Sequence, residues 1–272
     1  MEAPPAAKIC FITAIYGGYE KTCKPYAKQT VPADFICFTD SKTLTPNGWT
    51  IDNTPYHLTD KSHLDNDTYI NSLSNNTHTF NVAKYYKQAF QNIPILKKYD
   101  AIVWLDGSVE IIYDKTAEYI LSRIYTHKII GWHHEFRNGV LRNEAVGSGD
   151  SRYSSTFWNN QRQPRQDVMA QYNEYVRNGY SEDYFKSLGP CSPHLGVWIT
   201  CFVAFFNKDS IVSEFLDFWY LQTLMHTTQD QVGFSYACQK KKLIPYTLPN
   251  NEISGQDPHV ATQIYRKHGH NE

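Results

Sequence analysis

A short run of β-forming apolar residues, Ala101–Leu105, ends abruptly at Asp106, Gly107 and Ser108. Such a run between turn residues is typical of a strand buried on both faces, as in the parallel sheet of an α/β protein. Ligands of open α/β sheets bind at the carboxyl ends of the strands. A carboxylate there, followed by a glycine that permits a sharp turn, suits a hydrated divalent cation or a ribose hydroxyl. Taken alone, Asp-Gly is equally typical of a plain turn.

Other apolar runs and amphipathic patterns predict a fold in which strands and helices alternate in the first half and mix in the second. The sequence therefore predicts an α/β fold with a mostly parallel central sheet. Further strands are predicted at residues 8–16, 34–39, 49–51, 127–132, 196–207 and 243–246. Helices are predicted at residues 81–99, 116–125, 166–179, 210–224 and 230–239.

Composition limits the classes of protein to which the chain can belong. Its 272 residues fit one large α/β domain or two small ones, and the net charge of −1 argues against a nucleic-acid partner, which needs a basic stripe. The chain has no apolar window long enough for a membrane span, and its N-terminus does not resemble a signal peptide. The six cysteines form no CxxC pair, and three of them lie in apolar runs. We therefore expect a soluble, cytoplasmic protein with buried thiols.

Polar residues gather at the predicted strand ends. Gly17 and Gly18 follow the first strand and permit close approach to a phosphate or a base, although a plain turn has the same pattern. A dense ionisable cluster, His133, His134 and Arg137, with Glu144 a few residues on, follows the strand at 127–132, which favours a functional site. Two polar stretches, residues 57–80 and 145–165, are predicted as surface loops or lids.

Several of these motifs occur in an order and spacing that resemble one known family. It is a glycosyltransferase-like family first catalogued as a domain of unknown function, which includes plant pectin- and mucilage-related proteins. The resemblance covers about residues 8–240. The motifs are Tyr16-Gly17-Gly18-Tyr19-Glu20, Phe35-Ile36-Cys37-Phe38-Thr39-Asp40, Ala83-Lys84-Tyr85-Tyr86-Lys87, Trp104-Leu105-Asp106-Gly107-Ser108-Val109-Glu110-Ile111, His134 with Arg137 and Glu144, and Asp230-Gln231.

The resemblance implies a GT-A fold, an αβα sandwich that binds a nucleotide diphosphate and carries a mixed acceptor-binding half. On this basis residues 1–272 form a single GT-A-like domain. Residues 8–113 would form the nucleotide-sugar-binding half, residues 114–250 the acceptor-binding half, and residues 251–272 a tail.

The activity implied by the resemblance is transfer of a sugar from a nucleotide donor to a hydroxyl of a glycan or glycoconjugate. The expected donor is a UDP-sugar such as UDP-xylose, UDP-galactose or UDP-glucose. Glycosyl transfer expels a nucleoside diphosphate, so a divalent cation or Lys and Arg side chains must stabilise the negative charge that develops. Asp106 and Ser108 stand where other GT-A enzymes carry Asp-x-Asp, and they would hold Mn²⁺ or Mg²⁺. His259 is the first candidate for a third metal ligand and His194 the second.

Further site residues are carried over by the same resemblance. Asp230 would contact the acceptor hydroxyl, with Glu144 as the alternative general base. Two departures from the family are Ser108 in place of a carboxylate and Gln229 where a basic residue is frequent. The predicted donor-binding residues are Thr13, Ala14, Tyr16 and Gly17 for the base and ribose, Lys84 and Lys87 for the phosphates, Asp106, Gly107 and Ser108 at the strand tip, and His134 and Arg137 for sugar hydroxyls or the diphosphate.

Two other functions compete with this one. Because the acidic motif is incomplete, the chain could be a catalytically silent nucleotide- or sugar-binding domain on the same fold. A nucleotidyltransferase that makes activated sugars is a third reading. It requires a Gly-rich basic loop after the first strand, which Tyr16-Gly17-Gly18-Tyr19 does not provide.

Overall fold

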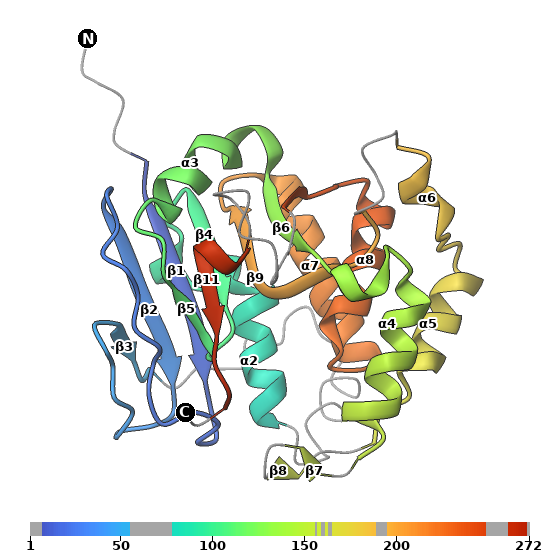
Figure 1. Ribbon diagram of the computed structural model, residues 1–272, viewed down its shortest axis with the longest axis horizontal. Coiled ribbons are helices and arrows are strands. Elements are labelled where there is room, and N and C mark those ends of the chain that lie inside the picture. Colours follow the sequence, from blue (N-terminus) through green and yellow to red (C-terminus); the bar gives the residue numbers. More distant parts are fainter. Residues whose placement is uncertain are drawn as a thin grey trace.

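A twisted β-sheet runs through the centre of the protein in the computed structural model, which describes residues 7–54, 78–155, 157–158, 161–162, 165–188, 195–248 and 261–270 (Figure 1). Within these residues the sheet has seven strands, and β9 alone runs antiparallel to its neighbours. The strands, in spatial order, are β10 (Tyr246–Leu248), β6 (Ile129–His133), β9 (Trp198–Phe206), β4 (Ala101–Leu105), β1 (Ile9–Ile15), β2 (Ala33–Thr39) and β3 (Thr50–Asp52).

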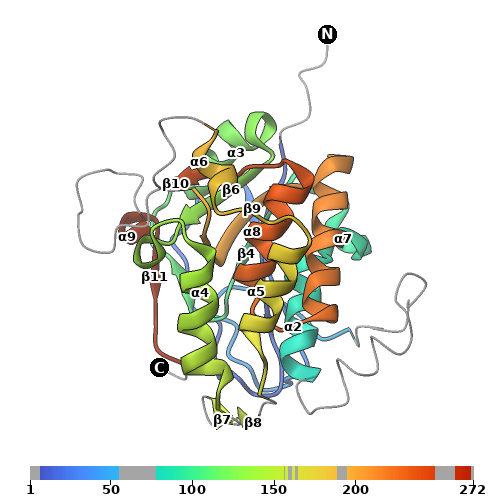
Figure 2. The ribbon, with the colours of Figure 1, turned by 90° about the vertical axis from the view of Figure 1, so that its right-hand side faces the viewer.

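Helices cover both faces of this sheet (Figures 1 and 2). One core cluster joins α2, α7 and α8 to one face, and a second joins α3 to the other face. The three layers confirm the predicted α/β class. The helices are α2 (His78–Gln88), α3 (Thr116–His127), α4 (Leu141–Ser148), α5 (Val168–Arg177), α6 (Asp183–Lys186), α7 (Ser210–Met225), α8 (Asp230–Lys241) and α9 (Ala261–Ile264), with 3₁₀ turns at Phe90–Asn92, Pro94–Leu96 and Glu135–Arg137 and a π-helix at Gly149–Tyr153.

Two small sheets complete the described structure. β5 (Val109–Ile111) pairs antiparallel with β11 (Tyr265–Lys267), and β7 (Phe157–Trp158) pairs with β8 (Gln161–Arg162). The first pair brings the C-terminal part of the chain back to the loop that follows β4 (Figure 1). Residues 261–270 therefore belong to the fold, although the sequence predicts residues 251–272 as a tail.

The central strands consist mainly of apolar residues because both of their faces are buried. All seven residues of β1 are buried. Ile12 packs in the cluster under α2 and α7, whereas Phe11 points to the opposite face and stacks on Phe35 with ring centroids 4.5 Å apart. Side chains alternate between the faces of a strand, so a strand between two helical layers has few polar positions, and the one polar side chain of β1, Thr13, is buried. This is why the strands predicted at residues 8–16, 34–39 and 101–105 are confirmed.

The helix predicted at residues 81–99 is shorter than its apolar pattern suggests. α2 ends at Gln88, and two 3₁₀ turns follow. Ile93 is extended because it precedes Pro94, whose ring disfavours a helical conformation of the residue before it. Phe90 and Leu96 stay buried in the same core cluster, so the apolar spacing continues where the helix does not.

Other predictions also need correction. The last strand, β10, lies at Tyr246–Leu248 rather than at residues 243–246. The stretch 145–165, predicted as a lid, continues α4 into the π-helix as far as Tyr153, and this helical segment packs against α5. Most of the polar stretch at 57–80 lies outside the described residues.

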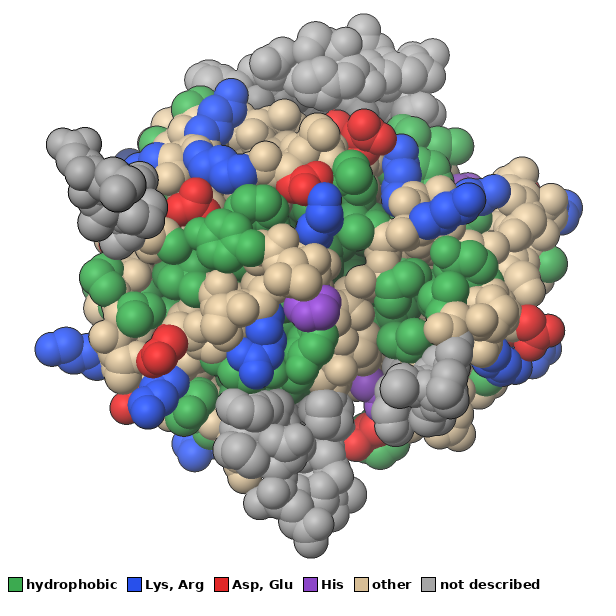
Figure 3. Space-filling view, turned by 90° about the horizontal axis from the view of Figure 1, so that it is seen from above, with side chains coloured by type: hydrophobic (Ala, Val, Ile, Leu, Met, Phe, Trp, Pro, Cys, Tyr) green, Lys and Arg blue, Asp and Glu red, His purple; other side chains and the backbone are tan. Residues whose placement is uncertain are grey.

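The outer surface mixes charges of both signs. On the face seen in Figure 3, at the side where β1 begins, basic, acidic and apolar side chains are interspersed. No helix in the described part of the chain combines the length and the apolar character that a bilayer crossing requires.

Candidate active site

Asp106 lies at the carboxyl end of β4, where its backbone N–H donates to the carbonyl of Cys201 on β9 (2.8 Å). Its Oδ1 accepts hydrogen bonds from Trp104 Nε1 (2.7 Å) and from Lys87 Nζ (3.4 Å). Oδ2 accepts none from the described residues, and 45% of the side chain is exposed. Gly107 lets the chain turn closely past β1, because a Cβ at this position would lie 3.2 Å from Ile15. Asp106 therefore presents one carboxylate oxygen at a strand tip.

A cleft of about 350 Å³ opens at the carboxyl ends of β1 and β4. Its walls come from the loop after β1, from α2, from the loop after β4, from the π-helix and from the segment that follows β11. Seven of the residues predicted to bind the donor line it. They are Ala14, Tyr16, Lys84, Lys87, Asp106, Gly107 and Ser108.

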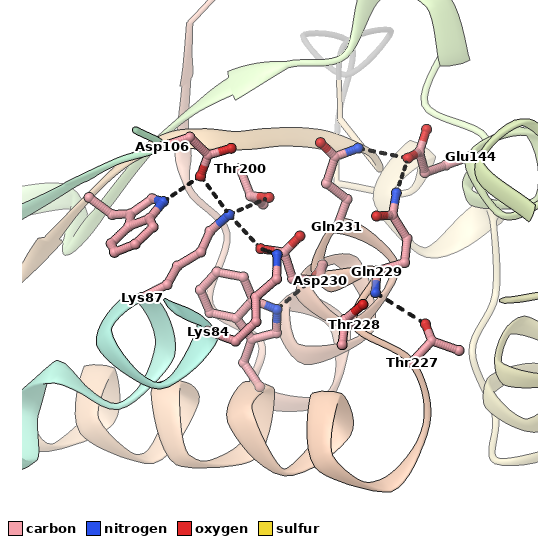
Figure 4. Close-up of polar contacts among 12 residues, drawn as sticks. Lys84, Lys87, Asp106, Glu144, Thr200, Thr227, Thr228, Gln229, Asp230 and Gln231 are labelled. Atoms are coloured by element: carbon pink, nitrogen blue, oxygen red, sulfur yellow. Dashed lines mark hydrogen bonds and ion pairs between the residues drawn. The ribbon is translucent and has the colours of Figure 1, made fainter. Parts of the chain in front are cut away.

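Two lysines of α2 meet one carboxylate of α8 beside this cleft (Figure 4). Lys84 Nζ lies 2.9 Å from Asp230 Oδ2, and Lys87 Nζ contacts the same oxygen. Lys87 Nζ also donates to Thr200 Oγ1 at 3.2 Å. The lysines lie on one side of α2 because residues three apart are neighbours on a helix. Asp230 is only 4% exposed and does not line the cleft.

The pKa values of the three groups follow from this contact. Burial alone would raise the pKa of Asp230, but Lys84 and Lys87 outweigh it and hold that pKa well below its usual range. Burial lowers the pKa of Lys84 to about 8, in spite of the opposing charge of Asp230. For Lys87, the charges of Asp106 and Asp230 outweigh burial and raise the pKa. At neutral pH, Asp230 is ionised between two ammonium groups and is not available as a base.

Glu144 forms a second buried network next to the first. Its side chain accepts hydrogen bonds from Arg137 Nε (2.6 Å), from Gln231 Nε2 (2.8 Å) and from Gln229 (Figure 4). His134 Nε2 lies 3.5 Å from the same carboxylate. Of this group, Gln231 alone reaches the cleft lining among the described residues.

Burial dominates the electrostatics of this second network. It raises the pKa of Glu144, and the hydrogen bonds from Arg137, Gln229 and Gln231 offset part of that rise. Burial and the charges of Arg137 and Lys267 lower the pKa of His134 to about 4. His134 is therefore neutral at pH 7, and Arg137 supplies the positive charge that Glu144 faces.

The end of β11 and the residues that follow it form one rim of the cleft. The backbone N–H of His268 donates to the carbonyl of Ser108 (2.9 Å), and its Nε2 lies 2.6 Å from Glu110. His270 Nδ1 lies 2.7 Å from Glu20, which is buried. These contacts place Lys267 and both histidines in the cleft lining.

The remaining predicted site residues lie elsewhere. Thr13 is buried within β1, and Gly17 donates its N–H to the Asp40 carboxylate (3.1 and 3.2 Å) instead of lining the cleft. His134 and Arg137 surround Glu144 outside the cleft lining. The metal candidates His259 and His194 lie outside the described residues.

Several cleft residues are not predicted from the sequence. Arg152 lies in a stretch whose glycine and serine content suggests a loop, and nothing in the pattern indicates the π-helix that carries it. Lys267, His268 and His270 belong to a polar segment whose partners are far away in sequence. Gln231 is part of the Asp230-Gln231 motif, so its place in the cleft could have been predicted together with that motif.

The donor set of the described residues does not fit a resident divalent cation. No three histidine, cysteine or carboxylate side chains of the described part of the chain come together as metal ligands. Asp106 offers one oxygen, while Lys84, Lys87, Arg152 and Lys267 line the same space. Hard divalent cations take several oxygen ligands, and a ring of basic groups repels them.

Comparisons with known proteins do not assign the chain to a family. No protein-family model matches the chain, and no curated protein matches it in sequence. Among solved structures, the apo structure of WbbM, described as a bifunctional glycosyltransferase, resembles it with a TM-score of 0.41 and 10% identity over 87% of this chain. The chain spans 38% of the length of that protein. The family suggested by the sequence motifs therefore stays a prediction, and the function is argued from the cleft.

Proposed function

We propose that the protein is a glycosyltransferase that moves a sugar from a UDP-sugar donor to a hydroxyl group of a glycan. The observation that carries the proposal is the cleft at the ends of β1 and β4, where basic side chains of three different elements surround one exposed carboxylate, Asp106. Ligands of α/β sheets bind at this edge, and a basic cleft is suited to the diphosphate of a nucleotide sugar.

The groups of the cleft have distinct roles in this proposal. Lys84 contacts the diphosphate, and Lys87 beside it adds positive charge, while Tyr16 and Ala14 form the wall for the base and ribose. The free oxygen of Asp106 accepts a hydroxyl of the ribose or of the sugar. The bond between sugar C1 and the β-phosphate oxygen breaks with its electron pair on the phosphate, and the acceptor oxygen bonds to C1. The acceptor proton ends on the released diphosphate or in water.

The direct test is a screen of UDP-glucose, UDP-galactose and UDP-xylose for release of UDP, together with calorimetric titration of UDP. We expect UDP to bind and at least one donor to be consumed. Ala83→Phe should weaken UDP binding because Ala83 lines the cleft, whereas the same change at the exposed Ala170 of α5 should not. Absence of binding by UDP and by other nucleoside diphosphates would rule out the proposal.

A catalytically silent nucleotide-sugar-binding domain is the second candidate, and one observation favours it. Among the described residues, the two carboxylates proposed as bases do not line the cleft: Asp230 lies behind Lys84 and Lys87, and Glu144 is bound to Arg137. UDP binding without consumption of any donor sugar, in the presence of glycan acceptors, would select this candidate.

A further inference from the structure

Positive charge dominates the described lining of the cleft. Four basic side chains face it, Lys84 and Lys87 from α2, Arg152 from the π-helix and Lys267 from β11, against the single carboxylate of Asp106. At separations of a few ångströms, like charges repel by about 1 kcal/mol in water and by several times more in a partly buried site. A divalent cation in this space would meet that repulsion, whereas a diphosphate would relieve it.

The neighbouring carboxylates are already committed to other partners. Asp230 lies between the two lysines, and Glu144 is bound to Arg137. Glu110 and Glu20 hold the two histidines of the rim. Even Asp106 uses one oxygen for Trp104 and Lys87. The carboxylates of the described residues thus orient cationic groups around the cleft and are not gathered to receive a metal ion.

We propose that the basic side chains of the cleft, Lys84, Lys87, Arg152 and Lys267, hold the donor diphosphate in place of a divalent cation. The proposal rests on the proposed function and goes beyond it in stating what neutralises the leaving group. The electron pair of the broken C1–O bond arrives on a phosphate oxygen, and Lys84, Arg152 and Lys267 donate hydrogen bonds to that oxygen and its neighbours. Lys87, whose ammonium already contacts Asp106, Asp230 and Thr200, adds its positive charge. Charge-assisted hydrogen bonds of this kind are among the strong ones.

The first arm of the test is calorimetric titration of UDP into the 272-residue chain in buffer treated with EDTA, and again with Mn²⁺ or Mg²⁺ added. We expect UDP to bind in EDTA, with an affinity that added cation changes by less than about threefold, or less than about 0.7 kcal/mol. Raising the ionic strength should weaken binding, because the contacts are ionic and salt screens them.

The second arm uses neighbouring residues of β11. Lys267→Met removes a basic group that lines the cleft, and Arg266→Met removes one that does not. Both side chains are exposed, so both variants should fold. Loss of a charge-assisted contact typically weakens binding by about tenfold, so Lys267→Met should raise the UDP dissociation constant by about that factor and Arg266→Met should leave it unchanged.

Asp106→Asn separates the two ways of neutralising the diphosphate. The amide keeps an acceptor for Trp104 but removes the negative charge. With the basic side chains as the binding groups, UDP should bind the variant equally well with and without cation, as it does the unchanged protein, whatever the variant loses in its contact with the ribose.

The outcomes distinguish this inference from the proposed function. Binding of UDP only with Mn²⁺ or Mg²⁺ and its loss in Asp106→Asn would overturn the basic-cleft inference and leave the glycosyltransferase proposal standing. Failure of every nucleoside diphosphate to bind, with or without cation, would overturn both. Binding in EDTA that is weakened by Lys267→Met and not by Arg266→Met would establish the inference.

Discussion

Asp230 begins α8 with its carboxylate held between the ammonium groups of Lys84 and Lys87. The backbone carbonyl of the same residue accepts a hydrogen bond from Trp219 Nε1 at 2.8 Å, so main chain and side chain are both fixed. A buried carboxylate of this kind acts on the cleft through the lysines that it positions. In the proposed function Asp230 is therefore a positioning residue.

Replacing Asp230 by Asn should be strongly destabilising, because two buried ammonium groups lose their shared counter-charge. Removing one partner of a buried ion pair costs about 3–5 kcal/mol, and we expect a loss of this size in the free energy of unfolding measured in urea. Asp183→Asn on α6 is the control, since its side chain is 84% exposed and the change should cost less than about 1 kcal/mol. Equal losses in the two variants would contradict the buried role of Asp230.

The depressed pKa of Asp230 also predicts how the free energy of unfolding changes as the pH falls. An ionised carboxylate is stabilised in the folded state, so its contribution is complete above the pKa of an unfolded Asp, near 3.9. That contribution is lost as the pH falls through the folded-state pKa. The unfolding free energy of Asp230→Asn should therefore fall less steeply in acid than that of the unchanged protein.

Lys84 gives a pH dependence of ligand binding. Its pKa of about 8 reflects burial and the facing groups Asp230 of α8, Lys87 of the same helix, Asp106 after β4 and Arg152 of the π-helix. In the proposed function the charged form of Lys84 binds the diphosphate, so UDP affinity should be level well below pH 8 and decline through pH 8 as the ammonium loses its proton. Calorimetric titrations on both sides of pH 8 measure this.

Lys84→Arg is the matched variant for that measurement. Arginine stays protonated over the whole range, so the variant should keep its affinity above pH 8. The same decline in Lys84→Arg would assign the pH dependence to another group.

At the scale of elements, the sequence predicts the strands and helices whose buried residues form one continuous run or one regular pattern along the chain. β1, β2 and β4 carry buried apolar residues on both faces, and α7 begins after Asp209, whose side chain accepts from the N–H of Ile211 at 2.8 Å. The end of α2 is not predicted, because the 3₁₀ turns after it bury apolar residues at nearly helical spacing. Periodicity reports which face is buried and is less sensitive to the type of helix.

The entry to β9 depends on one glycine. Gly196 has a φ of +124°, and a Cβ there would lie 2.2 Å from the carbonyl oxygen of Gly139. Gly196→Ala should therefore cost more than about 2 kcal/mol of unfolding free energy. Gly18→Ala is the control, because its φ is +67° but no atom lies within 4 Å of the added Cβ, and it should cost only about 1 kcal/mol. Thermal or urea unfolding of both variants measures the difference.

At the scale of the whole molecule, the cleft combines residues from most of the length of the chain. The sequence predicts the part that lies on β1, α2 and β4, because strand ends and a helical lysine pair are local patterns. It does not predict the rim, because the contact between Glu20 and His270 joins residues 250 positions apart. Nor does it show that Asp230 and Glu144 are bound to basic partners, since those contacts depend on how α2, α4 and α8 pack.

Ligand binding should therefore change the amide hydrogen exchange of segments that are distant in sequence. We expect UDP to slow amide hydrogen exchange in α2 and in residues 261–270 together, because both line the cleft. Exchange in α6, which lies away from the cleft lining, should not change. Protection of α2 alone would show that the segment after β11 takes no part in binding.

The pairing of β11 with β5 has a consequence for biosynthesis. Lys267, His268 and His270 come after all the other described cleft residues in the sequence. They are therefore synthesised last, after the cleft residues of β1, α2 and the loop that follows β4. Before β11 pairs with β5, the cleft that the lysines of α2 line lacks this rim. The edge of β5 that pairs with β11 then has unpaired backbone N–H and C=O groups. The binding site is therefore complete only after β11 has paired with β5.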